Sequence, residues 1–211
     1  MPAGRGPDLC GRIAEGLAAL GLEADADLAG RLADYLELLG RWNRVYNLTA
    51  VRDPEQMVVL HLLDSLVALP FLHGTRIADV GSGAGLPGIP LALAEPCRRF
   101  DLIEPATKKC RFLEQARIAL SLSNVTVRCR RAEALSGGYE TLVSRALGPA
   151  RRVWEQAAHL LMPGGRMVLL KGRHPRTELE ALPAEAGRAR VVAVNVPGLD
   201  ADRHIVTIDR A

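Results

Sequence analysis

Residues 76–91 read Arg-Ile-Ala-Asp-Val-Gly-Ser-Gly-Ala-Gly-Leu-Pro-Gly-Ile-Pro-Leu, and this stretch decides the fold. Its short apolar start, which contains Asp79 and ends at Val80, predicts a buried β-strand. Three alternating glycines follow: Gly81, Gly83 and Gly85. Glycine lets the backbone turn tightly and approach a ligand closely. The stretch therefore predicts a strand–turn–helix unit with a turn suited to a small-molecule ligand.

The spacing of the glycines separates two classes of ligand. The dinucleotide-binding form, Gly-X-Gly-X-X-Gly, needs its third glycine at position 86, where this chain has Leu86. The form Gly-X-Gly-X-Gly, with an acid two residues before it, resembles motif I of Rossmann-type methyltransferases, which bind S-adenosylmethionine. That cofactor has a cationic ammonium and sulfonium and no phosphate, so an acid suits it better than the bare helix N-terminus that a pyrophosphate prefers. For the motif alone, a nucleotide-binding domain and a turn without a ligand are the alternatives.

The composition is that of a globular protein outside the membrane. Of the 211 residues, 48% are hydrophobic and 24% are charged, as in ordinary globular domains. The longest apolar run, Met57 to Leu63, is interrupted by His61 and is far shorter than the roughly 20 residues that span a bilayer. No continuous apolar segment near the start resembles a signal peptide. We expect a cytoplasmic protein.

The cysteines are scattered along the chain, and no two form a C-x-x-C pair: Cys10, Cys97, Cys110 and Cys129. This spacing argues against a zinc site and against a disulfide framework. We expect four reduced thiols.

Hydrophobic periodicity divides the chain into three parts. Residues 1–8 are rich in glycine and proline, and we expect a disordered tail. Residues 9–74 are expected to form a helical extension that packs on the core, and residues 75–211 the cofactor-binding domain. Apolar positions at helical spacing predict three helices in the extension, at 9–22, 27–42 and 54–69. Asp53 is the expected N-cap of the third helix, with Pro54 at its first position.

Strands and helices alternate from residue 75 onward. The predicted strands are 76–80, 99–104, 125–130, 140–145, 166–171, 189–196 and 204–209. The predicted helices between them are 86–95, 107–121, 150–162 and 176–184. Short connections between such units imply a doubly wound, mostly parallel sheet with helices on both faces. The last two strands have no helix between them, so a C-terminal antiparallel hairpin should complete seven strands, as in class I Rossmann-like methyltransferases.

Ligands of such sheets sit beyond the carboxyl ends of the strands. Asp79 and the glycines end the first strand, with Leu86 expected to pack near the methionyl end of the cofactor. Glu104 ends the second strand, 25 residues after Asp79, close to the spacing at which an acid meets a ribose. Ala132 and Glu133 follow the third strand and suit an adenine ring and its amine. Arg145 ends the fourth strand and is the residue expected between cofactor and substrate.

The sequence offers no base, nucleophile or metal cluster for the methyl acceptor. An Asn/Asp-Pro-Pro-aromatic motif, used on adenine amines, is missing where Ser144-Arg145-Ala146 stands. The Pro96-Cys97 pair lies before the second strand, on the wrong side of the sheet for a cysteine nucleophile. Guanine N7 has a free lone pair, so its methylation needs positioning rather than proton removal.

Arginines supply candidate clamps for RNA, because guanidinium binds phosphate bidentately. The net charge is only +3, so clustering is the informative property. Basic residues gather in three places along the sheet: Arg128, Arg130 and Arg131; Arg145, Arg151 and Arg152; Lys171, Arg173, His174 and Arg176. In the extension, Arg41 and Arg44 alternate with Trp42 and Tyr46, as on RNA-stacking surfaces, although core packing of the two rings is the competing interpretation.

Several motifs together resemble the bacterial small-subunit rRNA methyltransferase G family, also called glucose-inhibited division protein B. The chain from about residue 30 carries the resemblance. The motifs are Arg41-Trp42-Asn43-X-X-Tyr46-Asn47-Leu48-Thr49-X-X-Arg52-Asp53-Pro54, His61-X-X-Asp64-Ser65, the stretch from Asp79 to Pro90, Ser144-Arg145-Ala146, Leu170-Lys171-Gly172 and Arg203-His204.

The resemblance implies a methyltransferase that uses S-adenosylmethionine, releases S-adenosylhomocysteine and modifies N7 of one guanine, position 527 in the 530 loop of 16S rRNA. It implies cofactor contacts at Gly81, Leu86, Ala132, Glu133 and Arg145. It points to RNA contacts at Asn43, Asn47, Arg52, Lys171, Arg173 and Arg203, with the small ribosomal subunit or its assembly intermediate as partner. We expect no metal, and a monomer.

Two departures and two alternatives qualify this expectation. Glu104 stands where the family often has Asp, and residues 148–151 differ from the commoner pattern. His61 and Asp64 share a helical face, which fits either a structural hydrogen bond or an RNA contact.

The alternatives to rRNA methylation are a small-molecule methyltransferase, which would need a lid, and a non-catalytic RNA-binding protein, which would be expected to have lost the glycines or Arg145.

Overall fold

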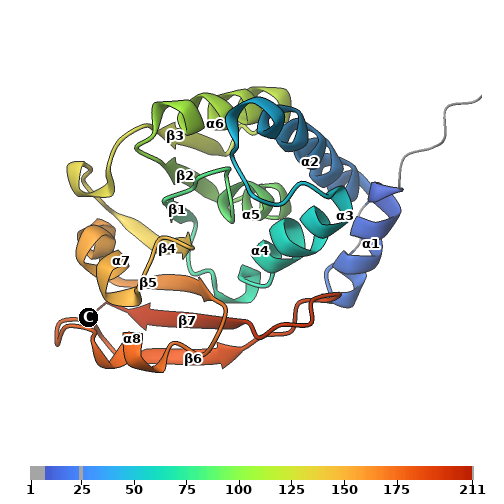
Figure 1. The fold of residues 1–211 in the computed structure, drawn as a ribbon. Helices are drawn as coiled ribbons and strands as arrows, with labels where there is room; N and C mark the ends of the chain where they lie inside the picture. Colours follow the sequence, from blue (N-terminus) through green and yellow to red (C-terminus); the bar gives the residue numbers. More distant parts are fainter. Residues whose placement is uncertain (1–7, 24–25, 211) are drawn as a thin grey trace, which may run out of the picture.

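The computed structural model describes residues 8–23 and 26–210 and contains one seven-stranded sheet (Figure 1). The strand order is β3-β2-β1-β4-β5-β7-β6. The strands are β1 (Arg76–Val80), β2 (Arg99–Ile103), β3 (Val125–Arg128), β4 (Tyr139–Arg145), β5 (Leu161–Lys171), β6 (Ala189–Ala193) and β7 (His204–Asp209). The first five run parallel, and β7 is antiparallel to both β5 and β6. The predicted doubly wound sheet with a C-terminal antiparallel hairpin is confirmed.

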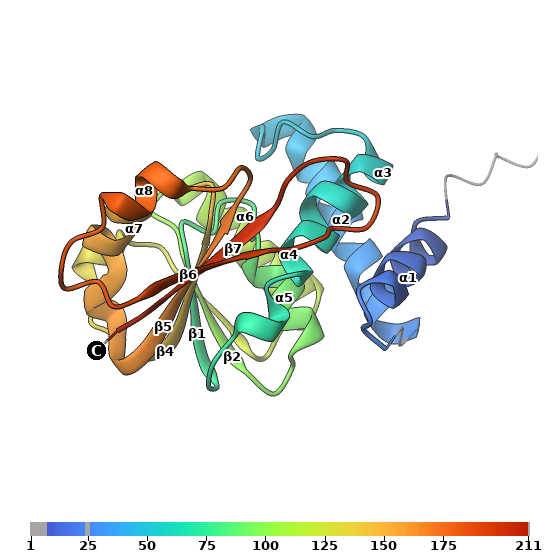
Figure 2. The same cartoon turned by 90° about the horizontal axis from the view of Figure 1, so that it is seen from below.

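Helices cover both faces of this sheet, as Figure 2 shows in a view close to the edge of the sheet. One face carries α7 (Ala150–Ala157) and α8 (Arg176–Glu180). The other carries α5 (Gly88–Ala94) and α6 (Thr107–Ala119). The switch in strand order between β1 and β4 places the ends of both strands at the usual ligand site of such folds.

The helical extension lies on the α5–α6 face (Figure 2). It consists of α1 (Leu9–Ala19), the long α2 (Ala26–Tyr46), and a helix made of α3 (Pro54–Met57), the π-helical turn η1 (Val58–Leu63) and α4 (Asp64–Leu66). Asp53 caps α3 by accepting hydrogen bonds from the amides of Glu55 and Gln56, and Pro54 is at the first position. The predicted cap is therefore confirmed. Asp8, assigned to the expected tail, caps α1 instead; residues 1–7 lie outside the described residues.

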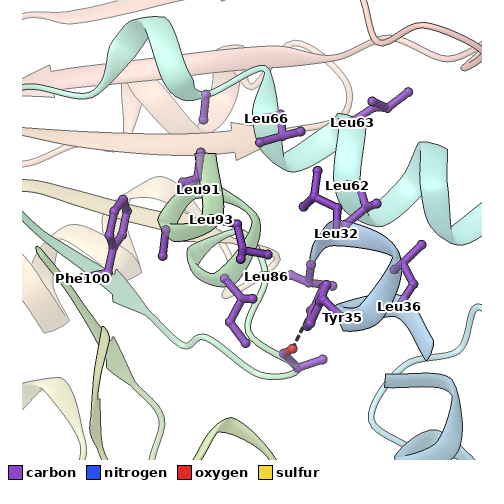
Figure 3. Close-up of a cluster of buried hydrophobic side chains, with 14 of the residues drawn as sticks. Leu32, Tyr35, Leu36, Leu62, Leu63, Leu66, Leu86, Leu91, Leu93 and Phe100 are labelled. Atoms are coloured by element: carbon purple, nitrogen blue, oxygen red, sulfur yellow. Dashed lines mark hydrogen bonds between the residues drawn. The ribbon is translucent and has the colours of Figure 1, made fainter. Parts of the chain in front are cut away.

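The extension and the sheet share one hydrophobic core. Leu32 and Leu36 from α2 and Leu62 and Leu66 from the third helix form a cluster with Leu86 of the glycine loop, as the close-up in Figure 3 shows. The same cluster contains side chains of α5 and of β1 and β2, such as Leu91, Ile77 and Phe100. The residues of the extension are thus built into the fold and form its outer layer on this face.

The aromatic residues of α2 lie in this packing. Trp42 stacks on Tyr46 with ring centroids 5.1 Å apart, and its edge meets Phe112 of α6 at 5.7 Å. Lys108 lies over the other ring, 5.3 Å from its centroid. Trp42 thus packs against the core, as the competing interpretation held, and Tyr46 stacks on it, with both rings half-buried.

Two expectations need correction. Residues 161 and 162 belong to β5 and not to the predicted helix 150–162, because Leu161 pairs with Tyr139 before the register shifts; β5 thus begins five residues before the predicted strand 166–171. The four cysteines are not all reduced, because Cys110 and Cys129 form a disulfide between α6 and the segment after β3. Their separation of 19 residues gave no signal in the sequence; the pair meets because α6 packs back beside β3. Cys10 and Cys97 are free and exposed.

Candidate functional site

Two cavities open where the parallel strands end. The first, about 220 Å³, is lined by Gly81, Ala132, Glu133 and Leu147 among others, and we call it the glycine-loop cavity. The second, about 460 Å³, is lined by His61, Asp64, Arg145, Ala146, Lys171 and Arg203 among others, and we call it the arginine cavity. Arg145 and Ala146 face one cavity, whereas the next residue, Leu147, faces the other. The end of β4 therefore separates two neighbouring sites.

The glycine loop is shaped by hydrogen bonds to the end of β2. The amides of Gly81 and Ser82 both donate to the carbonyl oxygen of Ile103, at 2.9 and 3.1 Å. Gly83 has a φ of +59°, which favours glycine, and a Cβ built there meets only the Gly81 carbonyl oxygen, at 3.8 Å. By contrast, a Cβ on Gly85 would collide with Ile89. The loop thus leaves open space at Gly83 and is closely packed at Gly85.

Asp79 lies beneath this loop, completely buried. Its Oδ2 accepts a hydrogen bond from the amide of Gly88 at 2.9 Å, while its Oδ1 has no partner among the described residues. Burial raises the pKa of this carboxyl to about 7, against the lowering effect of the hydrogen bond from Gly88. Asp79 therefore shapes the loop from below, and it does not line either cavity.

Glu104 connects the glycine loop to the segment after β2. Its Oε2 accepts a hydrogen bond from the amide of Gly83, and its Oε1 one from the amide of Ala106, both at 2.9 Å. An ionised carboxylate has about four lone-pair sites, so each oxygen keeps capacity for a ligand. The acid predicted for the ribose is thus fixed beside the open face of Gly83.

The other predicted cofactor residues divide between cavity and core. Ala132 is buried and Glu133 is exposed in a short 3₁₀ turn, η3 (Ala132–Ala134), and both line the glycine-loop cavity with Gly81. Leu86 and Gly85 are packed on the side of the core, where Leu86 is labelled in Figure 3. The structure therefore brings Gly81, Ala132 and Glu133 together and places Leu86 behind the loop.

In the arginine cavity, one acid holds two arginines. Asp64 Oδ2 lies 3.0 Å from Arg145 Nη1, and Asp64 Oδ1 lies 2.6 Å from Arg203 Nε. Arg145 Nη1 also donates to the carbonyl oxygen of Leu60 at 2.8 Å. The side chains are 16%, 22% and 9% exposed for Arg145, Arg203 and Asp64. Largely buried charges need fixed partners, so this triad holds both guanidinium groups in place at the cavity wall.

His61 lies on the same helix as Asp64 but contacts a different partner. Its Nε2 is 2.9 Å from Thr49 Oγ1, and its buried Nδ1 has no partner among the described residues. Burial lowers the pKa of His61, so the ring is neutral at pH 7. The π-helical turn η1, which carries His61, is a type of irregularity that is frequent at functional sites.

The predicted RNA residues lie at three places around the arginine cavity. Lys171 lines it, but its Nζ is held by Glu178 at 2.7 Å and by the Gly148 carbonyl oxygen at 2.6 Å. Arg173 is exposed after β5. Asn47 and Arg52 are exposed in the α2–α3 loop and bond to each other at 3.2 Å. Asn43 is buried, and its amide group bonds to the backbone of Thr49 and Val51; it therefore shapes that loop from within.

Two contributions were missing from the sequence interpretation. Asp64 had no assigned role, because its partners Arg145 and Arg203 are 81 and 139 residues away. Tyr35 lies within the helix that apolar spacing predicted at 27–42, yet its hydroxyl donates to the carbonyl oxygen of Ala84 in the glycine loop at 2.7 Å (Figure 3). A tyrosine within a leucine stripe was the available signal, since a buried hydroxyl usually has a partner.

None of the helices in the described part of the chain has the length and apolarity to cross a bilayer. The fold resembles solved methyltransferases. It superposes on the O-methyltransferase TomG from Streptomyces achromogenes with a TM-score of 0.57 at 17% identity, covering 84% of this chain and 90% of that one. Aeropyrum pernix fibrillarin, solved with bound S-adenosyl-L-methionine, gives a TM-score of 0.55 at 19% identity over 70% of this chain and 73% of that one. At such identities the likeness shows the fold.

The sequence comparisons are more specific. The profile of the rRNA small subunit methyltransferase G family matches residues 29–206, from α2 to β7. Proteins named ribosomal RNA small subunit methyltransferase G are 47% identical in Nitrosospira multiformis, over 95% of this chain and 97% of the relative, and 46% identical in Methylococcus capsulatus, over 93% and 96%. One from Xanthomonas campestris is 45% identical, over 97% and 96%. With its glycine loop and its arginine cavity in one continuous match, the chain belongs to the rRNA small subunit methyltransferase G family.

Proposed function

We propose that this protein transfers a methyl group from S-adenosylmethionine to N7 of a single guanine in the 530 loop of 16S rRNA. The observation that carries this proposal is the pair of cavities separated by the end of β4. A glycine loop lines one of them, and a fixed pair of guanidinium groups lines the other. This arrangement suits a cofactor and a nucleotide that meet at Arg145.

The glycine-loop cavity fits the proposed cofactor. Glu104 lies at the open face of Gly83, where its carboxylate can accept hydrogen bonds from a ribose. The small, buried Ala132 leaves room for an adenine ring, and Glu133 can accept a hydrogen bond from its amine. When bound, S-adenosylmethionine supplies an electrophilic methyl group. The protein's part is to hold the cofactor and to keep the acceptor in line.

The arginine cavity fits an acceptor that needs no deprotonation. Guanine N7 has a free lone pair, and O6 beside it accepts hydrogen bonds. Arg145 and Arg203 retain donors that Asp64 does not use, and these donors can hold O6 or a phosphate. Asp64 acts as a positioning residue, because it fixes both guanidinium groups. Placing the lone pair beside the methyl group then supplies catalysis through orientation.

We place the RNA over the surface that joins Asn47, Arg52 and Arg173 to the cavity, with Arg203 and Lys171 at the cavity wall. Asn43 acts indirectly, by holding the loop that carries Asn47 and Arg52. The partner is the small ribosomal subunit or its assembly intermediate, and we propose that the protein acts as a cytoplasmic monomer.

The test is to incubate the protein with labelled S-adenosylmethionine and small subunits from cells that lack it. N7-methylguanine is then mapped by borohydride–aniline cleavage. We expect one cleavage, within the 530 loop. Label in the RNA without cleavage would reject N7 as the target atom. No label in RNA, with cofactor binding confirmed, would favour a small-molecule acceptor.

A further inference from the structure

We propose that a third cavity, between α1, α2 and α3, binds a nucleotide that flanks the methylated guanine. This extension pocket, of about 500 Å³, is lined by Arg41, Arg44, Arg52, Leu36, Gly40 and Met57 among others. The inference rests on the proposed function, because it assigns a second RNA subsite to the same enzyme. It concerns a separate pocket within the extension, whereas the proposed methyl transfer takes place at the two cavities beyond the ends of the strands.

The charge around this pocket is unbalanced. Among the residues that the structure describes, three guanidinium groups line it, and Glu37 is the single carboxylate in its lining. Arg52 donates to the neutral amide of Asn47, and among residues 8–23 and 26–210 no carboxylate lies within ion-pair distance of Arg41 or Arg44. Unpaired guanidinium groups around a cavity favour an anionic ligand.

The floor of the pocket is apolar and fixed. Leu36 and Met57 are each 2% exposed, and Leu9 and Pro54 complete the apolar wall. A volume near 500 Å³ lies within the range of small-molecule sites. Charged groups at the rim and an apolar floor match a nucleotide, whose phosphate is anionic and whose base is flat. RNA-binding proteins commonly hold splayed-out bases against apolar or guanidinium surfaces in this way.

The pocket lies directly behind the wall of the arginine cavity. The α2–α3 loop separates the two: Val51 lines the arginine cavity, whereas Arg52, the next residue, lines the extension pocket. Asn43 holds this loop through the backbone of Thr49 and Val51, and Thr49 contacts His61 of the arginine cavity. Two sites on either side of one fixed loop suit two nearby nucleotides of a single strand.

Gly40 offers a sharp test of this subsite. A Cβ at Gly40 meets no atom of the described residues within 4 Å and Gly40 lines the pocket, so the side chain of Gly40→Leu would occupy part of it, and leucine is the better helix former. Gly30→Leu is the matched control, because Gly30 lies on the same helix, also faces open space and lines none of the described cavities. Binding of unmethylated small ribosomal subunits is measured by co-sedimentation without cofactor, beside the affinity for S-adenosylmethionine.

We expect Gly40→Leu to weaken subunit binding roughly tenfold, with Gly30→Leu close to the wild type and cofactor affinity unchanged. Arg44→Gln should lower the slope of log affinity against log salt by about 1. Arg190→Gln, which changes an exposed arginine of the edge strand β6, should leave that slope unchanged.

The outcomes separate this inference from the proposed function. Unchanged subunit binding by Gly40→Leu, with methylation by the wild type intact, would overturn the subsite alone. Weaker binding by Gly40→Leu, with no methyl transfer by the wild type, would overturn the proposed function, and the pocket would then be an RNA-binding site that has no methylated guanine beside it. An unchanged salt slope for Arg44→Gln would show that the occupant has no phosphate, which contradicts the subsite. A wild type that does not bind subunits would overturn both.

Discussion

At the scale of single residues, the site depends on three residues whose surroundings set their roles. Gly83 is the one loop glycine whose missing side chain leaves open space. Arg145 stands where the two cavities meet. Asp79 is a buried acid with one oxygen that has no partner among the described residues. Each of them supports a separate prediction.

Gly83→Val should weaken S-adenosylmethionine binding at least tenfold, because its side chain would fill the open space beside Glu104. A positive φ strains any β-branched residue, so strain needs its own control. Gly164→Val provides it, since Gly164 has a φ of +74°, no neighbour within 4 Å of its Cβ, and a position outside both cavities. Calorimetric titration of both variants gives the answer, and equal affinities would contradict a cofactor at Gly83.

Arg145→Ala should reduce methyl transfer by at least about a hundredfold, as loss of a key charged donor typically does, and leave the fold intact. The fold should survive because Asp64 keeps its second partner, Arg203. Single-turnover transfer and thermal melting are the measurements, and Arg145→Lys, which keeps the charge but loses the planar fork, should be nearly as inactive. A well-folded, active Arg145→Ala protein would remove Arg145 from the mechanism.

Asp79 should make stability depend on pH between about 4 and 7. Burial raises the pKa of this carboxyl from 3.8 to about 7, so in this window the folded protein binds more protons than the unfolded chain. Stability relative to Asp79→Asn must therefore fall as the pH rises, by at most about 1.4 kcal/mol per pH unit. Urea unfolding of both proteins at pH 5, 6 and 7 tests this, and parallel pH profiles would show an ordinary pKa.

At the scale of elements, connections between segments distant in the chain hold the site together. The disulfide between Cys110 and Cys129 joins α6 to the segment after β3. Glu104 precedes α6, and Ala132 follows the second cysteine. The disulfide thus spans the two segments that carry the proposed ribose and adenine contacts.

Reduction of this disulfide should lower the free energy of unfolding by about 3 kcal/mol, the usual entropic contribution of a loop of this size. Urea unfolding with and without a dithiol reductant measures this change in the free energy of unfolding. Because Cys129 is exposed, its replacement by serine provides a control. Cys129→Ser should unfold identically with and without reductant. Thiol titration of the unreduced protein should find only Cys10 and Cys97 free; four free thiols would contradict the disulfide.

The sequence predicted features that depend on local patterns and missed those that depend on contacts between distant residues. The period of apolar residues and the glycine run are local signals, and they predicted the strands, the cap at Asp53 and the cavity residues Gly81 and Ala132. The Asp64–Arg145–Arg203 triad, the Tyr35–Ala84 bond and the disulfide join residues that are far apart in the chain. No periodic pattern records such pairs, because they depend on how the helices pack. The extension pocket went unpredicted for the same reason.

At the scale of the whole molecule, the extension and the sheet form one packing unit. Leu32, Leu36 and Leu62 of the extension are in the same buried cluster as Leu86 and Leu91 of the α/β domain. Without the extension, a broad apolar face over α5 would meet water. Burial of each large aliphatic side chain contributes about 1.5–3 kcal/mol, and a domain's net stability is only about 5–15 kcal/mol.

Residues 75–211 alone should therefore fail to fold cooperatively. Full-length protein should melt in one transition seen equally by near- and far-ultraviolet circular dichroism, whereas the fragment should show no cooperative melt. A fragment with a sharp transition of its own would mean that the extension is an independent domain.

The hydrogen bond from Tyr35 to Ala84 has a consequence for linkage between ligands. Helix α2 holds the glycine loop through Tyr35 and carries Arg41 and Arg44 further along the same rigid rod. A movement of α2 would therefore displace both the glycine loop and the two arginines. If RNA held by the arginines changes the affinity for the cofactor by some factor, then the cofactor must change the affinity for RNA by that same factor, because the coupling free energy is reciprocal. Tyr35→Phe removes this hydrogen bond at a residue that lines neither of the proposed ligand sites. The variant therefore tests the coupling between the two ligands separately from the affinity for each of them.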